Sequence, residues 1–396
     1  GSYAIVAYLF CGVMLASIML CYAEIGTRVT SAGGSYAYVE AAFGNYAGFV
    51  VNWLYFFLWG IIGDAALMNV VADSLAAIFP IFSNPWVRGL LFFVLIAFMI
   101  LINIRGAKLG VAFVKAIVII KILPLIGIII FGISKINTAN FHWDHLPAFS
   151  TFNDTILILF FAFAGFETAL GMSGEIKNPK RTIPAGIFLA AVLVLCMYLF
   201  LQTVTQAVLG TQMEAVKDAP LAAVAHSIVG SAGGIILLAT AAISCFGGIF
   251  GDVLNTPRVL FAGAKDGLFP KFLTKVHPKF ATPYLAIITY ASLIFIFSVS
   301  GGFKQLAVLA SAAILLIYLA VILATIKLRT KKQDATEKTF RVPGGSIIPL
   351  IGIATIIWVL TGLSNQEILS TSVFIAVVSV IYFLMKKVKE RKEAVL

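Results

Sequence analysis

Residues 152–174 read FNDTILILFFAFAGFETALGMSG, and the central part of this stretch, Phe160 to Glu167, decides how the chain must fold. The stretch has the length and apolar character of a spanning helix, which needs about 20 residues. Small residues and a glycine stand beside a glutamate in its middle. This pattern suits a helix that breaks and leaves backbone groups to hold a polar ligand. The alternative is a glycine notch for helix packing next to a satisfied glutamate, and these residues alone leave both open.

The composition of the whole chain places such helices in a membrane. Of the 396 residues, 61% are apolar and 11% are charged, and the mean hydropathy is +1.04. Soluble domains are roughly half apolar and about a quarter charged. Cytosolic enzymes and nucleic-acid-binding proteins are therefore excluded, and the chain is an integral membrane protein.

The sequence carries no recognisable catalytic or metal-binding motif. Its four cysteines lie inside apolar runs and its four histidines lie in or beside predicted loops. There is no Walker loop, no nucleophile elbow and no zincin helix. We therefore predict that the protein is not an enzyme and that it needs no metal or cofactor.

Apolar runs of about 20 residues predict eleven transmembrane helices. They cover residues 4–26, 45–79, 87–103, 108–133, 152–174, 184–210, 233–262, 283–300, 305–327, 346–363 and 369–386. Short alternating strands are absent, and backbone in lipid must satisfy its own hydrogen bonds, so all eleven should be helices. The second run is too long for a perpendicular span and must tilt or extend beyond the membrane. The fold class is a single all-α transmembrane domain.

The 28 lysines and arginines predict the topology. If Gly1 lies outside, the basic clusters fall in inner loops, as the positive-inside rule requires. The outer loops hold only Arg88, Lys135, Lys217 and Lys304. Topology therefore explains the net charge of +11 without a nucleic-acid partner. An external start with an odd helix number leads us to expect one further helix before Gly1.

Several motifs in combination resemble the amino acid–polyamine–organocation (APC) superfamily of transporters. FAGFE at 163–167 continues to E-x-K-N-P-K-R-x-I-P at 175–184. CYAE at 21–24 with GGSYAY at 33–38 resembles the helix 2–3 region, and RVLFA at 258–262 with DGLFP at 266–270 resembles the end of helix 8 and its loop. The chain is similar to the bacterial arginine–agmatine antiporters. It departs from them because the G-S/A-G break of their first helix is absent.

The resemblance implies the leucine-transporter-like fold, with two inverted five-helix repeats and two accessory helices. This chain would supply helices 2–12: an incomplete first repeat over about 1–134, a second over about 151–327, and accessory helices over about 346–386. The substrate would lie at mid-membrane beside the break, and alternating access would expose it to one side at a time. The binding segment would be Phe161, Ala162, Phe163, Ala164, Gly165, Phe166 and Glu167.

Within that segment, the resemblance assigns different roles. Backbone carbonyls from Phe161 to Ala164 would receive the substrate ammonium group. Phe161 stands where the similar antiporters carry a tryptophan that covers the substrate. For Phe163 and Phe166, ligand contact and ordinary packing both stay open.

Ionisable residues deep in a span must face the bundle interior or an aqueous cavity, because they are costly in hydrocarbon. The residues concerned are Asp64, Lys121, Glu167 and Asp252. Three acids against one lysine favour a proton or a cationic ligand, although pairing with Lys121 is the structural alternative. Lys121 resembles the helix 5 lysine that sodium-independent family members carry, so we predict a coupling role for it. Glu24 and Arg28, near an inner helix end, suggest a structural cap or a gate.

Asp252 and Asp64 are predicted to contact the substrate. Counting back from DGLFP places Asp252 on the substrate-facing position of helix 8, and Asp64 lies near the expected side-chain pocket on helix 3. Two carboxylates there would favour a cationic side chain or a polyamine. In the competing interpretation, one acid neutralises Lys121 and the other is protonated, which leaves a small neutral pocket.

The sequence therefore predicts a secondary active transporter of amino acids in the cytoplasmic membrane, independent of Na⁺, working by exchange or proton coupling. The alternative substrates are polyamines or cationic amino acids. A channel or a non-transporting membrane protein is the remote alternative, because a channel would need repeated polar rings. The expected partners are the substrate and the lipid bilayer, with a homodimer left open.

Overall fold

The computed structural model describes residues 2–29, 33–143, 146–168, 179–217, 219–265, 267, 269–330 and 340–393. These residues form helices and no strand. The α-helices are α1 (Tyr3–Arg28), α2 (Ser35–Phe43), α3 (Asn45–Trp53), α4 (Ile62–Ile78), α5 (Pro85–Arg105), α6 (Ala107–Gly132), α7 (Phe149–Phe163), α8 (Pro179–Leu209), α9 (Pro220–Val229), α10 (Ser231–Lys265), α11 (Tyr284–Ser300), α12 (Phe303–Arg329), α13 (Ile347–Leu360) and α14 (Asn365–Glu393). A π-helix, η1 (Leu54–Ile61), joins α3 to α4. Short 3₁₀ turns are η2 (Pro80–Ser83), η3 (Ile133–Lys135), η4 (Thr138–Asn140), η6 (Gly210–Glu214) and η7 (Lys271–Thr274).

Within the described part of the chain, 9 helical stretches are long and apolar enough to cross a membrane. They correspond to nine of the eleven predicted spans. The other two predicted spans are helices as well, but α11 has 17 residues and α13 has 14. The prediction of helices is therefore confirmed, whereas the count of eleven spans and the further helix before Gly1 stay predictions. The short helix α9 was not predicted.

The second span is the long one that the sequence indicates. It runs over 34 residues from Asn45 to Ile78, which is roughly 50 Å of helix against a hydrocarbon core of about 30 Å. Its middle is the π-helix η1. Such π segments are rare inside α-helices and occur often near functional residues.

The chain divides into two compact units. Unit 1 comprises Gly1–Val6, Gly60–Pro147 and Met197–Ala307, and unit 2 comprises Ala7–Trp59, Ala148–Cys196 and Val308–Leu396. Each unit takes segments from both halves of the sequence. This grouping in space does not test the predicted repeat boundaries, which stay a prediction.

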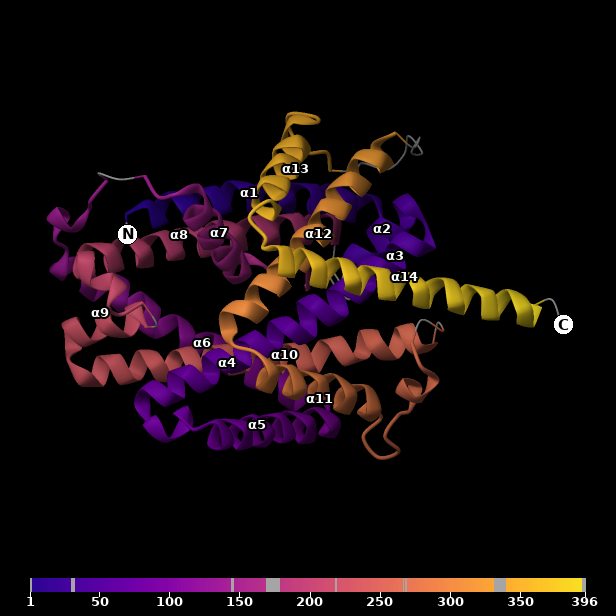
Figure 1. The fold of residues 1–396 in the computed structure, drawn as a ribbon, viewed down its shortest axis with the longest axis horizontal. Helices are drawn as coiled ribbons and strands as arrows, with labels where there is room; N and C mark the ends of the chain where they lie inside the picture. Colours follow the sequence, from indigo (N-terminus) through magenta and orange to yellow (C-terminus); the bar gives the residue numbers. More distant parts are fainter. Residues whose placement is uncertain are drawn as a thin grey trace. The chain divides into compact units, whose positions relative to one another are not determined.

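Helix α10 is the centre of unit 1. It packs against α4, α6, α9 and α11, and α5 packs against α11 (Figure 1). Gly247 of α10 permits close contact with α6, because an added Cβ would lie 2.5 Å from Ile117 Cγ2. A cluster of buried apolar side chains, which includes Val204 of α8 and Val224 of α9, joins these two helices to α6 and α10.

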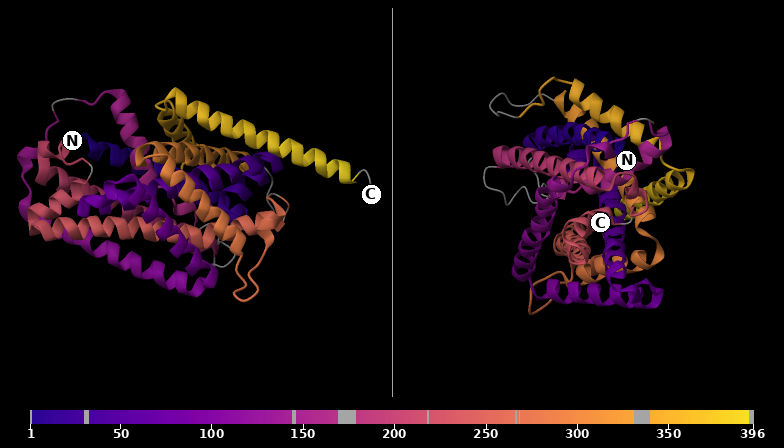
Figure 2. Two further views of the ribbon diagram at one scale, coloured as in Figure 1. Left: turned by 60° about the horizontal axis from the view of Figure 1, so that its bottom comes forward. Right: turned by 90° about the vertical axis from the view of Figure 1, so that its left-hand side faces the viewer.

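Unit 2 contains α2, α3, α7, α13 and α14, with most of α1 and α12 and the first part of α8. α13 packs against α7, and α14 packs against α3. Figure 2 shows α14, in yellow, as one uninterrupted helix. Asn153 of α7 donates from its amide to the carbonyl of Trp358 in α13, at 3.0 Å.

Candidate functional site

The helix at the centre of the predicted binding segment breaks. α7 ends at Phe163, Ala164 is extended with φ −73° and ψ 160°, and Gly165 has a φ of +118°. Only glycine adopts such a φ readily. A Cβ built on Gly165 meets no described atom within 4 Å, so this glycine serves the backbone conformation and is not a packing notch.

The Glu167 side chain folds back over the break. Its Oε2 accepts the backbone N–H of Gly165 at 3.1 Å and the hydroxyl of Tyr318 at 2.5 Å. The side chain is buried, with 2% of its surface exposed. Each interpretation of this stretch is thus right in one part: the helix is broken, and one carboxylate oxygen of the glutamate is hydrogen-bonded. Glu167 holds the break in shape.

An aromatic cluster surrounds this glutamate. The rings of Tyr22 and Phe166 are 5.2 Å apart, those of Phe166 and Tyr318 are 5.4 Å apart, and those of Tyr22 and Tyr318 are 5.5 Å apart. The hydroxyl of Tyr22 also hydrogen-bonds Ser35 Oγ at 2.7 Å. Sequence reasoning missed both tyrosines. Each tyrosine could have been recognised in the sequence, because it places a hydroxyl group inside a long apolar span, where that group needs a buried hydrogen-bond partner.

The other phenylalanines of the segment have different surroundings. Phe163 is buried and lies edge-to-face with Tyr8, at 6.1 Å. Phe161 is partly exposed and lies edge-to-face with Trp59, at 5.7 Å. Phe163 therefore packs inside unit 2, whereas Phe161 and Trp59 form an aromatic pair next to the break. The motif that follows, with Glu175 and Lys177, lies outside the described residues.

Asp64 and Asp252 meet in unit 1. Asp64 lies on α4 with 2% of its surface exposed, and its Oδ2 accepts the Tyr290 hydroxyl at 2.8 Å. Asp252 of α10 lies close enough to interact electrostatically with Asp64 and Tyr290, and Thr256 of α10 lies beside the Tyr290 hydroxyl. Two adjacent buried carboxyl groups repel each other when both are charged, so this arrangement favours a shared proton or a bound cation. Tyr290 is a further residue that sequence reasoning missed.

Lys121 does not join this acidic pair. It lies half-buried on α6, close to Cys245 of α10. Cys245 precedes Asp252 by two helical turns, which is roughly 10 Å along the axis. No residue in the described ranges hydrogen-bonds or ion-pairs with the Lys121 ammonium group.

Glu24 and Arg28 belong to a buried ion-pair cluster at the end of α1. Arg329 donates from Nε to Glu24 Oε1 at 2.8 Å and from Nη2 to Oε2 at 2.6 Å, and Arg28 donates to Oε1 at 3.2 Å. The backbone N–H of Val342 donates to Oε2 at 2.8 Å. The carboxylate is fully buried. This arrangement joins α1, α12 and the segment before α13, and so supports the structural interpretation of the pair.

Known proteins similar to this chain are membrane transporters. A family model described as amino acid permease matches residues 1–385. The chain is 28% identical to the serine/threonine exchanger SteT of Bacillus subtilis, covering 98% of this chain and 89% of the relative. It is 26% identical to the branched-chain amino acid permease BcaP of Lactococcus lactis, over 99% and 89%. It is also 26% identical to the mouse large neutral amino acids transporter small subunit 2, over 84% and 64%.

The family match accounts for the fold and the location of the protein. It covers almost the whole chain, and it agrees with the all-helical architecture and the multiple spanning helices. The protein is accordingly a multi-pass transporter of the cell membrane and not an enzyme, with the leucine-transporter-like helical fold. This chain belongs to the amino acid permease family of the APC superfamily.

Proposed function

We propose that the protein moves neutral amino acids across the cytoplasmic membrane by alternating access, without Na⁺. The observation that carries the proposal is the helix break at Ala164 and Gly165 inside a candidate span. The carboxyl end of a helix carries a partial negative charge, which favours a cation such as the amino group of a substrate. The substrate ammonium group then binds backbone carbonyls between Phe161 and Ala164.

The aromatic pair of Phe161 and Trp59 is suited to cover the substrate side chain. Both rings lie beside the break, and their faces are apolar. An apolar cover of this kind favours uncharged side chains. The relatives SteT and BcaP are named for serine, threonine and branched-chain amino acids, whose side chains are uncharged as well.

The acidic pair also bears on substrate charge. In one interpretation Asp64 and Asp252 attract a cationic side chain; in the other, one acid neutralises Lys121, the second is protonated and the pocket is neutral. In this proposal the two adjacent carboxyl groups share one proton, and Tyr290 donates to Asp64, so the pair presents at most one negative charge. This favours a neutral substrate over a polyamine with two or more positive charges. A singly charged side chain remains the second candidate, with Asp252 as its partner.

We propose proton coupling or exchange as the source of energy. Lys121 is the coupling residue in this proposal, because a partly buried ammonium group can hold helices together as a bound cation would. The carboxyl pair offers a place for a transported proton. Exchange would need no transported proton.

The test is flux into liposomes that contain the full-length transporter. Saturable uptake that is stimulated by internal substrate and unchanged when choline replaces sodium supports the proposal. Competition with alanine, serine and leucine should exceed competition with arginine, ornithine, lysine and putrescine. A sodium requirement contradicts Na⁺ independence, and unsaturable flux indicates a channel. If only cationic compounds compete, and Asp252→Asn removes that competition, the second candidate replaces the first.

A further inference from the structure

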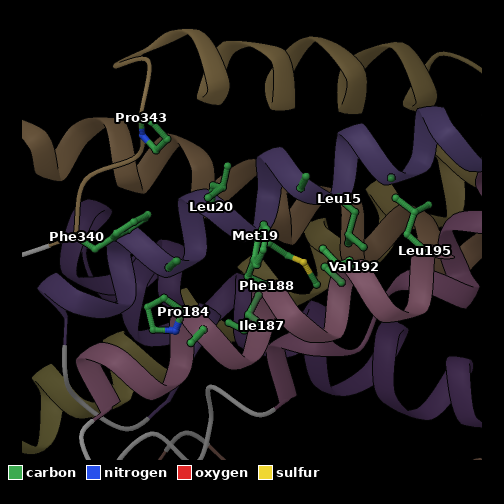
Figure 3. Close-up of a pocket in the computed structure, with 15 residues that line it drawn as sticks. Leu15, Met19, Leu20, Pro184, Ile187, Phe188, Val192, Leu195, Phe340 and Pro343 are labelled. Carbon is green, nitrogen blue, oxygen red and sulfur yellow. The ribbon is translucent and has the colours of Figure 1, made fainter. Parts of the chain in front are cut away.

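Unit 2 contains a cavity of about 500 Å³ between α1 and α8 (Figure 3). α1 lines it from Gly12 to Ala23, and α8 lines it from Pro184 to Leu195. Phe340 and Pro343, in the segment before α13, complete the lining. All lining side chains are apolar, and Figure 3 shows those of Met19 and Phe188 directed toward one another.

The apolar lining sets this cavity apart from the proposed transport site. An amino acid carries an ammonium and a carboxylate group, and burying either without a partner is costly. Both helices belong to candidate spans, so the cavity lies at the depth of the hydrocarbon chains. Its occupant must therefore be apolar over most of its length.

The dimensions of the cavity match one lipid chain. The lined stretch of α1, from Gly12 to Ala23, rises roughly 16 Å, about half of a hydrocarbon core of ~30 Å. At the Gly12 end the two helices meet, because a Cβ on Gly12 would lie 2.7 Å from Leu195 Cδ2. The cavity is thus bounded at one end and spans about one leaflet.

The other end of the cavity is positively charged. Glu24 follows directly after Ala23, and its single carboxylate is shared by Arg28 and Arg329. Arg341, next to Phe340, is exposed. These four described side chains are three arginines and one carboxylate, and their net positive charge complements an anionic headgroup.

We propose that this cavity binds one acyl chain of an anionic phospholipid, with the headgroup phosphate against Arg341. The apolar stretch of the cavity and its closed end at Gly12 fit the acyl chain. The basic end fits the headgroup phosphate. The Val342 N–H bond to Glu24 holds the lining segment in place, so a bound lipid also stabilises the contact between α1 and the chain before α13.

The experiment uses the full-length transporter in nanodiscs with phosphatidylglycerol or phosphatidylcholine carrying a photoreactive group on one acyl chain. Phosphatidylglycerol should label peptides that contain residues 12–23 and 184–195 more strongly than phosphatidylcholine. Excess inorganic phosphate should not reduce the labelling, because free phosphate lacks the chain. Labelling that is equal for both lipids, or that maps elsewhere, would overturn the proposal.

Two pairs of variants locate the lipid. Ala191→Trp fills the cavity and should abolish most of the labelling, whereas Ala190→Trp, at a neighbouring exposed position outside the lining, should leave it unchanged. Arg341→Gln should lower the preference for phosphatidylglycerol about fivefold, or roughly 1 kcal/mol for one basic side chain, whereas exposed Lys275→Gln should not. If Ala191→Trp fails to fold, Ala16→Leu fills the cavity from α1. Equal effects within either pair would contradict the proposal.

Discussion

Tyr318 donates its hydroxyl to Oε2 of Glu167, the same oxygen that accepts the backbone N–H of Gly165. A side chain on α12 therefore fixes the conformation of a broken helix 151 residues away in sequence. Because Glu167 is buried, water cannot replace this hydrogen bond cheaply.

We expect Tyr318→Phe to loosen the break. A hydrogen bond to a charged group contributes about 1.5–3 kcal/mol, so substrate affinity should fall by roughly tenfold or more, with a lower Tm. Tyr22→Phe is the matched control, because its hydroxyl bonds Ser35 and its ring belongs to the same cluster. Binding titrations on both variants measure the difference. Equal losses in affinity would show that the cluster, and not the bond to Glu167, sets the geometry.

Gly165→Ala should impair transport through backbone strain. At a φ of +118° an alanine costs about 1–3 kcal/mol, and α7 would tend to continue through the break. Gly186→Ala is the control, since that glycine lies in α8 with no described atom within 4 Å of an added Cβ and no positive φ. The control should be neutral or slightly more stable. Wild-type uptake by Gly165→Ala would mean that the break is not needed.

Lys121→Ala should abolish transport or change its pH dependence. Removal of the ammonium group takes away the cation that we propose as the coupling group. Lys135 is exposed in η3, the turn that follows α6, so Lys135→Ala should leave the pH profile of transport unchanged. Uptake is measured between pH 5 and 8 at a fixed membrane potential. A Lys121→Ala profile that matches the wild type in height and shape would remove this residue from the mechanism.

Glu24→Gln should destabilise the protein strongly. Removing one partner of a buried ion pair costs about 3–5 kcal/mol, because the arginines keep their charge without a carboxylate. Asp73→Asn breaks the Asp73–Arg88 pair, in which the Asp73 side chain is 57% exposed, and should cost less than about 1 kcal/mol. Thermal unfolding in detergent compares the two. A similar fall in Tm for both would show that burial does not govern the strength of the Glu24 cluster.

The candidate site could be predicted only in part. The break at Gly165 was visible in sequence because a glycine beside small residues is a local property of the backbone. The Glu167 bond to Gly165 spans two residues and is local too. The partners Tyr318 and Tyr290 were not visible, since they lie 151 and 226 residues from Glu167 and Asp64.

The sequence by itself determined that the protein is a helical membrane protein with a broken helix at Gly165, and its motifs indicated a transporter. The helices and the break follow from hydropathy and backbone preference, which neighbouring residues set. Only the tertiary structure decided that Asp64 lies beside Asp252 and accepts a hydrogen bond from Tyr290, that Lys121 stays apart from them, and that Arg329 meets Glu24. Each of these pairs depends on how a helix is rotated about its own axis when it packs. On an all-apolar helix no periodic pattern records that rotation, so packing alone sets it.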